Sequence, residues 1–335
     1  MNIIYSVLHL DKISLGPKTR ISMFIKVFQR QGDYVIEGKN KLLKTLKAPR
    51  AEMVYVETAP NRIGLIDVVN LLLLKKKSKK LVVFIRDVYI EMFPEEYTGF
   101  RKKITYFANR LSYRFLSWVG SELVFPTVQM GDFFYLKNKS FVQKPYKALP
   151  PGTSSDEFVT VLPDFSKTLG FLYLGSVSYK NSGFENFIRF ARQYQDRFNF
   201  FVLSKDPQIK TYQQNDYIKF DSVSHSEILN YIQKNNIAFG FHSRPRNAYD
   251  DITFPIKILD FINFRLPFVS APHLPLLSLV GSDYPLFVDI TQPRAIHESL
   301  KSLLLKESYQ KLVTKLDEVA QNNTYEVRYK QIIQA

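Results

Sequence analysis

Short apolar runs alternate with helix-like stretches along the whole chain, and this alternation limits the fold more than any other feature. In the first half, the pattern predicts strands over residues 2–9, 33–37, 52–57, 81–85 and 122–125 and helices over 19–30, 66–76 and 101–119. Strands that alternate with helices form parallel sheets with helices on both faces. The pattern therefore predicts an α/β fold.

Turn-forming residues interrupt this alternation at Leu149-Pro150-Pro151-Gly152. A second series follows, with strands predicted over 170–175, 198–204, 237–241 and 266–271 and helices over 184–194, 226–234, 256–264 and 294–305. The 335 residues suit two domains of about 150 residues each. We therefore predict domains 1–150 and 151–335, both doubly wound and Rossmann-like, facing across a cleft, with the last helix packing back on the first domain. In such sheets, ligands bind beyond the carboxyl ends of the strands.

The positive charge of the chain lies almost entirely in its first half. Residues 1–150 contain 26 Lys and Arg against 12 Asp and Glu, whereas residues 151–335 contain 20 against 19. This asymmetry indicates either a solubility device or a surface that meets a polyanion, which is nucleic acid or an anionic bilayer. No nucleic-acid-recognition motif is visible, so nucleic acid is the less expected partner.

The absence of cysteine excludes a disulfide framework, a thiol nucleophile and zinc–thiolate sites, and it fits a reducing compartment. The N-terminal segment has no charged leader followed by a cleavage site. The apolar runs are shorter than the ~20 residues that span a bilayer. From these observations we expect a cytoplasmic protein that is peripheral to the membrane.

Two segments combine cations with apolar or aromatic residues. The run 71–80 ends an apolar helix in five lysines, and the segment 101–118 mixes cations and aromatic residues at helical spacing. Basic side chains attract anionic lipid, and interfacial aromatic side chains add apolar burial. A solvated helix end and core-facing aromatic residues are the alternative interpretations. The residues predicted to face a membrane are Lys75, Lys76, Lys77, Lys79, Lys80, Arg101, Lys102, Lys103, Arg110 and Arg114.

The segment 254–270, FPIKILDFINFRLPFVS, resembles the donor-site motif of the retaining GT-B glycosyltransferases of family four. Their pattern is roughly P-x-K-x-x-E-Y/F-x-x-x-G-x-P-V-V. Three further parts of the chain agree with this family in order and spacing, namely 149–152, 172–175 with 180–183, and 83–87. The resemblance implies a GT-B fold, a nucleotide-sugar donor and transfer of a sugar, in particular a hexose with retention of configuration.

The chemistry of a nucleotide sugar accounts for the residue types in this motif. A cation stabilises the diphosphate, and a carboxylate accepts hydrogen bonds from the ribose. If a helix starts near Pro255, Lys257 lies in its first turn and Asp260 lies about one turn later on the same face. The resemblance then makes Lys257 the phosphate ligand and Asp260 the ribose ligand, and a solvated Lys–Asp pair is the alternative.

The resemblance also implies donor contacts elsewhere in the chain. For Arg244 and Arg246, plain surface charge is the alternative interpretation, and for Gly16 it is a simple turn. The remaining residues predicted to contact the donor are Gly16, Gly175, Lys180, Arg244, Arg246 and Pro255.

The sequence departs from the family pattern at three positions. Ile252 stands where many relatives carry a second carboxylate, and Ser176 replaces the arginine that often follows the strand glycine. Arg265 replaces the glycine of the motif. Because arginine does not readily adopt a positive φ, we expect the loop at Arg265 to differ from that of the family.

Arg86 and Asp87 end a predicted strand, where a cleft is expected. Asp87 is expected to orient or deprotonate an acceptor hydroxyl beside Arg86, and a helix cap or an Arg86–Asp87 pair is the alternative. His9 is expected to be structural. The chain has no Asp-x-Asp sequence, so we expect neither a required metal nor a cofactor besides the nucleotide sugar.

The sequence thus predicts a glycosyltransferase that moves a sugar from a nucleotide sugar to a glycan or lipid-linked acceptor, as in surface polysaccharide biosynthesis. A catalytically inactive GT-B-like partner of another transferase is the alternative, favoured by Ile252 and Arg265. A nucleic-acid-binding protein is a third hypothesis, which rests on charge alone.

Overall fold

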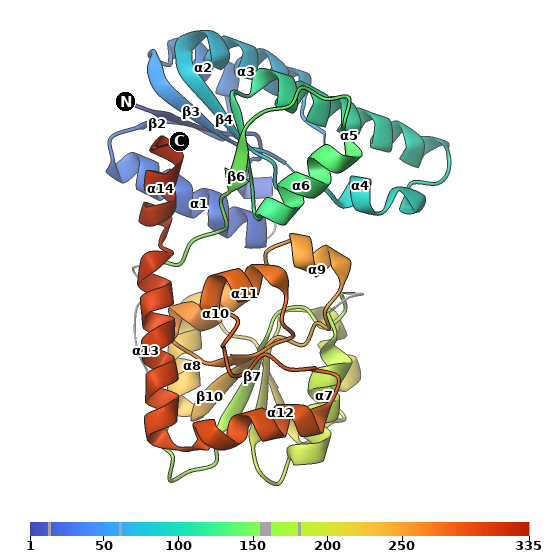
Figure 1. Ribbon diagram of the computed structural model, residues 1–335, viewed down its shortest axis with the longest axis vertical. Coiled ribbons are helices and arrows are strands. Elements are labelled where there is room, and N and C mark those ends of the chain that lie inside the picture. The colour runs from blue at the N-terminus through green and yellow to red at the C-terminus, as the bar shows by residue number, and fades with distance from the viewer. Residues whose placement is uncertain (13–14, 60–61, 155–161, 180–181, 335) are drawn as a thin grey trace. The chain divides into compact units, whose positions relative to one another are not determined.

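The computed structural model of the protein describes residues 1–12, 15–59, 62–154, 162–179 and 182–334. The chain forms two α/β units, each built on its own parallel sheet (Figure 1). The first unit comprises Met1–Gly152, Ile252–Phe254 and Tyr325–Ala335, and the second comprises Thr153–Asp251 and Pro255–Thr324. The first unit is therefore assembled from three separate stretches of sequence.

The sheet of the first unit has the strand order β2-β1-β3-β4-β5-β6, with all neighbours parallel. Apolar and β-branched residues fill its central strands, which suits a sheet buried on both faces. The strands are β1 (Ile3–Ser6), β2 (Tyr34–Ile36), β3 (Ala51–Glu57), β4 (Ser78–Phe84), β5 (Glu122–Phe125) and β6 (Tyr146–Ala148).

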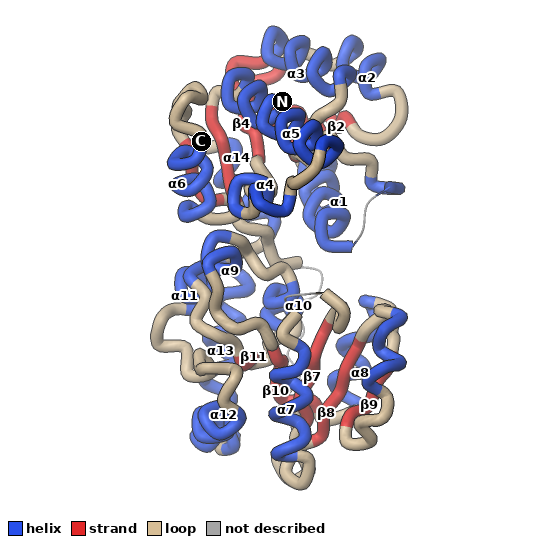
Figure 2. The backbone as a smooth tube through the Cα atoms, turned by 90° about the vertical axis from the view of Figure 1, so that its right-hand side faces the viewer, coloured by secondary structure: helices blue, strands red, loops and turns tan. Residues whose placement is uncertain are grey.

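Helices cover both faces of this sheet (Figure 2). On one face, α1 and α14 bury Phe24, Phe28, Tyr325 and Tyr329 against the strands. On the other face, α3, α5 and α6 contribute a second apolar cluster. The helices are α1 (Leu15–Arg30), α2 (Lys41–Lys47), α3 (Leu65–Lys77), α4 (Tyr89–Met92), α5 (Phe100–Val119), α6 (Val128–Lys137) and α14 (Tyr325–Ile333), with 3-10 turns at Leu10–Lys12 and Pro94–Glu96.

The sheet of the second unit has the order β11-β10-β7-β8-β9, again with parallel neighbours. Its strands are β7 (Gly170–Leu174), β8 (Asn199–Leu203), β9 (Ile218–Asp221), β10 (Ile237–Phe241) and β11 (Phe268–Val269). Its helices are α7 (Phe184–Tyr194), α8 (Ile228–Lys234), α9 (Ala248–Ile252), α10 (Lys257–Asn263), α11 (Leu274–Val280), α12 (Pro293–Leu300) and α13 (Lys306–Asn322), with 3-10 turns at Pro207–Tyr212, His225–Glu227 and Lys301–Leu304.

The strand order reverses direction once in each sheet. This switch point lies between β1 and β3 in the first unit and between β7 and β10 in the second. At such a point, the loops that follow two neighbouring strands run to opposite faces of the sheet. This leaves a crevice at the carboxyl ends of the strands, where a ligand can bind. Functional side chains are therefore expected at the carboxyl ends of these two strand pairs.

The lysine run at 75–80 does not form one helix end as the sequence pattern predicts. Helix α3 ends at Lys77, and strand β4 begins directly at Ser78. Pairing of β4 with β3, in which Ala51 faces Ser78 and Met53 faces Lys80, fixes the last two lysines in the sheet. Tertiary pairing thus overrides the helical tendency of a lysine-rich sequence.

None of the helices within the described residues is both long enough and apolar enough to cross a membrane.

Candidate functional site

The side chain of Lys257 reaches the end of strand β7. Lys257 is the first residue of α10, and a methyl group at Gly175 would lie 2.1 Å from the Lys257 Nζ atom. Gly175 has a φ of 113°, a conformation that favours glycine. The glycine after β7 therefore gives the backbone its turn and also leaves the space that the lysine occupies. Sequence reasoning placed both residues at the donor, and the structure brings them together.

The ammonium of Lys257 lies near the guanidinium of Arg244, and the Lys257 side chain is exposed to solvent at its surface. Desolvation and the guanidinium of Arg244 lower the pKa of Lys257 to about 8, and the carboxylate of Asp260 acts in the opposite direction. Neighbouring cations repel each other, and an anion placed between them relieves that repulsion. The arrangement is therefore suited to a ligand with negative charge.

Arg244 follows strand β10, the neighbour of β7 at the switch point. Its Nη1 atom lies 2.8 Å from Asp250 Oδ1, and its guanidinium carbon lies 5.5 Å from the ring centroid of Tyr179. Asp250 is buried, so this ion pair fixes the arginine. Asp250 thus holds a cation beside Lys257, although it is out of register with the carboxylate of the family motif.

The loop after β10 packs tightly on the start of α7. Asn186 Nδ2 donates to the carbonyl of Ser243 at 3.0 Å, and the Ser243 hydroxyl donates to the carbonyl of Ser182 at 2.5 Å. Gly183 has a φ of 65°, and a methyl group there would lie 2.1 Å from the Ser243 carbonyl oxygen. These contacts fix the backbone on both sides of the switch point. Lys180, another predicted donor ligand, lies outside the described residues.

Arg246 is directed elsewhere. Its Nε atom lies 2.9 Å from Asp251 Oδ2, and Asp251 Oδ1 also accepts from the amide of Leu274. Arg246 lines a hollow of about 320 Å³ together with Ala271, Phe287 and Ile290. The two predicted arginines therefore have different surroundings, and only Arg244 accompanies Lys257.

Asp206 organises the loop that follows β7, and sequence reasoning did not identify it. Its Oδ2 atom accepts from the Ser176 hydroxyl at 2.5 Å and from the Val177 and Ser178 amides at 3.1 and 2.9 Å. These hydrogen bonds, led by that of Ser176, hold the pKa of Asp206 well below its usual range. Ser176, which replaces the family's arginine, thus binds an aspartate three residues beyond β8.

Arg265 departs from the sequence expectation for its loop. We expected a different turn because the motif glycine is missing, yet Arg265 itself adopts a φ of 50°. Its guanidinium lies 2.6 Å from Asp317 Oδ1 and donates to the Asn263 carbonyl at 2.6 Å. The ion pair to α13 offsets the cost of a left-handed arginine. The expectation was therefore wrong, because the ion pair with the partly exposed Asp317 compensates for the lost glycine.

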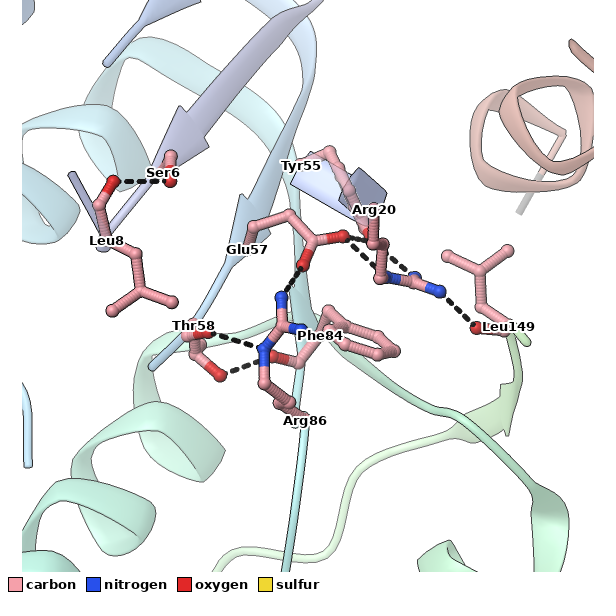
Figure 3. Close-up of polar contacts among 9 residues, drawn as sticks. All are labelled: Ser6, Leu8, Arg20, Tyr55, Glu57, Thr58, Phe84, Arg86 and Leu149. Atoms are coloured by element: carbon pink, nitrogen blue, oxygen red, sulfur yellow. Dashed lines mark hydrogen bonds and ion pairs between the residues drawn. The ribbon is translucent and has the colours of Figure 1, made fainter. Parts of the chain in front are cut away.

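In the first unit, a carboxylate with two arginines occupies the switch point (Figure 3). Glu57, the last residue of β3, is fully buried and lies 2.9 Å from both Arg20 Nε and Arg86 Nη2, through a different oxygen for each. Arg20 also donates to the Leu149 carbonyl at 3.1 Å and to the Tyr55 hydroxyl at 3.1 Å. Burial lowers the pKa of Arg86, with Glu57 acting in the opposite direction.

Asp87 is held at the start of α4. Its Oδ1 atom accepts from the amides of Val88 at 2.7 Å and Tyr89 at 3.0 Å, and the Tyr113 hydroxyl donates to its backbone carbonyl at 2.8 Å. One carboxylate oxygen of Asp87 therefore binds the two backbone amides that precede and begin α4, whose N-cap residue is Val88. Arg86, its neighbour in sequence, is bound to Glu57 on another strand.

Gly16, His9, Pro255 and Asp260 are the other residues singled out from the sequence, and each lies at or near the end of a helix or strand. Gly16 lies in the first turn of α1, and His9 lies between β1 and the turn Leu10–Lys12. Pro255 precedes α10 and accepts from the Ile258 amide at 3.0 Å. Asp260 lies in the first turn of α10, partly buried.

Among the predicted membrane-facing cations, Lys77, Lys79, Lys80 and Arg110 are engaged in the fold. Lys77 donates to the carbonyls of Leu46 and Ala48 at the end of α2, at 2.7 and 2.8 Å. Lys79 and Lys80 lie 2.8 and 2.6 Å from Glu52 and Glu122 on the flanking strands. Arg110 donates to Asn138 at 3.0 Å and lies 3.5 Å from Glu91. The other cations of this set, Lys75, Lys76, Arg101, Lys102, Lys103 and Arg114, are exposed. Of these, Lys75 and Lys102 donate to the carbonyls of Trp118 and Glu96 at 3.3 and 3.1 Å.

Comparison with protein-family models gives no match, and comparison with curated protein sequences gives none either. Solved structures, in contrast, are similar over nearly the whole chain. An α-glucosyltransferase in complex with UDP and a 13-mer DNA has a TM-score of 0.66 at 14% identity, covering 99% of this chain and 98% of that one. HepE from Anabaena, in complex with UDP and glucose, has a TM-score of 0.65 at 11% identity, covering 100% and 98%.

A third similar structure is the Escherichia coli trehalose-6-phosphate enzyme bound to UDP-2-fluoro-glucose. Its TM-score is 0.59 at 10% identity, covering 98% of this chain and 80% of that one. These neighbours are GT-B glycosyltransferases that use nucleotide sugars. The chain therefore has the GT-B fold, with two Rossmann-like α/β units.

Proposed function

We propose that the chain is a glycosyltransferase whose second unit binds a nucleoside-diphosphate sugar at the carboxyl ends of β7 and β10. The observation that carries this proposal is the position of the Lys257 ammonium against Gly175, next to Arg244. Two neighbouring cations at a sheet switch point suit a diphosphate that gains negative charge as the sugar leaves. The transferred group is a hexose, its configuration is retained, and no metal is required.

The acceptor in this proposal is a glycan or a lipid-linked glycan, as in the assembly of surface polysaccharides. The net charge of +14 on residues 1–150 supports a cytoplasmic enzyme that works beside an anionic membrane. The first unit then carries the acceptor side, with Asp87 and Arg86 at the end of β4, and the second unit carries the donor side.

The test is to incubate the purified chain with uridine-, guanosine- and thymidine-diphosphate sugars and measure release of the nucleoside diphosphate. Slow hydrolysis of one donor in the absence of acceptor is the expected result. A chain that binds a nucleotide but hydrolyses none of the donors would instead be an inactive partner of another transferase. Ile252 favours that second function, because an apolar side chain packed against the first unit's core stands at the second carboxylate position.

Asp87→Asn should lower turnover by about 10²–10⁴-fold and leave nucleotide affinity unchanged, since general-base work contributes in that range. Asn and Ser both cap helices well, so Asp87→Ser serves as a second variant that keeps the contact with the α4 amides. Turnover is measured with an acceptor extract, and affinity is measured by calorimetry. If both variants keep full turnover, Asp87 only caps α4.

A further inference from the structure

Helices α2, α3 and α5 form one outer layer of the first unit, with α3 between the other two (Figures 1 and 2). Lysines of α3 join them. Lys77 binds the carbonyls at the end of α2, and Lys75 donates to the carbonyl of Trp118 in α5 at 3.3 Å. The Lys75 ammonium also lies 4.6 Å from the centroid of the Trp118 ring. The layer is therefore a fixed surface, because each helix end is tied to its neighbour.

This layer exposes a large number of apolar side chains. On α5 they recur at helical spacing, which places most of them along one side of the helix. We call the following set the apolar face: Leu42, Leu43 and Leu46 of α2; Leu65, Ile66, Val69 and Leu72 of α3; and Phe100, Ile104, Phe107, Leu111 and Trp118 of α5. An exposed apolar area spread over three helices marks an interaction site.

The charge around the apolar face identifies its partner. Helices α2, α3 and α5 contain eleven Lys and Arg and a single carboxylate, Asp67. Asp67 is buried and lies 2.7 Å from Lys41, so it does not offset the exposed cations. A second copy of this chain would place the same cations against each other, which disfavours a symmetric dimer. An anionic bilayer accepts both the cations and the apolar side chains.

We propose that the apolar face inserts into the boundary between the headgroups and acyl chains of an anionic membrane. Phe107 and Leu111 enter the apolar region, and Lys76, Arg101, Lys102, Lys103 and Arg114 meet the lipid phosphates. Insertion, rather than adsorption by the lysine run alone, holds the protein on the bilayer. This deepens the proposed function by naming the surface that meets a lipid-linked acceptor.

The experiment uses the full chain with phosphatidylcholine vesicles that contain or lack phosphatidylglycerol. Phe107 and Leu111 are 66% and 69% exposed, so Phe107→Ser with Leu111→Ser should leave the fold intact. The double variant should bind anionic vesicles about tenfold or more weakly than the parent. The matched control is Leu136→Ser with Leu305→Ser, whose parent side chains are 61% and 65% exposed and lie outside the apolar face. This control should bind as the parent does.

The salt dependence of vesicle binding distinguishes insertion of the apolar face from adsorption by charge alone. At about 0.5 M NaCl charge attraction is strongly screened, and parent binding should weaken but persist. Fluorescence of Trp118, the only tryptophan, should shift to shorter wavelength on mixing with anionic vesicles and stay shifted in high salt. Complete loss of binding in high salt, with the Phe107/Leu111 variant equal to the parent in low salt, would show adsorption by charge only and overturn the proposal.

Sedimentation of the chain without lipid tests whether a second copy of the chain covers the apolar face. A dimer of the parent that the Phe107/Leu111 variant abolishes, together with no vesicle binding, would assign the apolar face to a second copy and overturn the proposal. Nucleotide binding is measured separately in lipid-free solution. Loss of nucleotide binding there with normal vesicle binding would refute the proposed function and leave the membrane surface standing.

Discussion

Replacing Glu57 by Gln should lower the free energy of unfolding by about 3–5 kcal/mol, the range observed when one partner of a buried ion pair is removed. Glu57 is fully buried and is the carboxylate that both Arg20 and Arg86 contact. A neutral amide leaves two buried guanidinium groups without a counter-charge. Urea unfolding followed by circular dichroism measures the effect.

Strand β3 offers a matched control for this variant. Glu52 also pairs with a cation, at 2.8 Å from Lys79, but both side chains are largely exposed. Exposed pairs contribute about 0–1 kcal/mol, so Glu52→Gln should change stability very little. Equal losses in the two variants would mean that the Glu57 cluster is not a buried charge network of the kind described.

Replacing Lys257 by Ala should weaken nucleoside-diphosphate binding by roughly tenfold to a hundredfold, since a hydrogen bond to a charged group contributes about 1.5–3 kcal/mol. The parent should also bind more weakly as pH rises through about 8, where the free lysine loses its proton. The diphosphate attracts only the charged form, so this pH dependence should disappear in Lys257→Ala. Calorimetry over a pH series measures both effects.

Lys311→Ala is the control for that experiment, because Lys311 is an exposed lysine of α13 in the same unit. It should bind nucleotide as the parent does.

Gly175→Ala tests the contact between Gly175 and Lys257 by changing the other residue, because the new methyl group would collide with the Lys257 ammonium. If Lys257→Ala and Gly175→Ala both bind normally, the donor diphosphate does not lie at the end of β7.

The alternation of strands and helices was predictable because most strands are continuous apolar runs. The strands over 52–57, 122–125 and 237–241 were predicted within one residue of β3, β5 and β10. β6 and β9 were not predicted, since Tyr146–Ala148 and Ile218–Asp221 are short and carry lysine among their few apolar residues. Such strands form because neighbouring strands pair with them, and a single sequence does not show that pairing.

In the candidate site, too, residues that belong to local motifs were predictable, and residues that act across strands were not. Lys257 and Gly175 belong to local motifs, so sequence spacing was enough to place both at one site. Asp206 and Glu57 act on residues of other strands, and neither belongs to a motif. A carboxylate at the end of an apolar strand, as in Val54-Tyr55-Val56-Glu57, was the one available signal for a buried charge.

The packing of α14 determines the order in which the protein can fold during synthesis. Tyr325, Tyr329 and Ile332 complete the core beside α1, yet they leave the ribosome after the whole second unit. At 5–20 residues per second, the ribosome needs about ten to thirty seconds for the intervening residues. Throughout that time Phe24 and Phe28 lack the contacts with Tyr325 and Tyr329, so the unit that is made first is finished last.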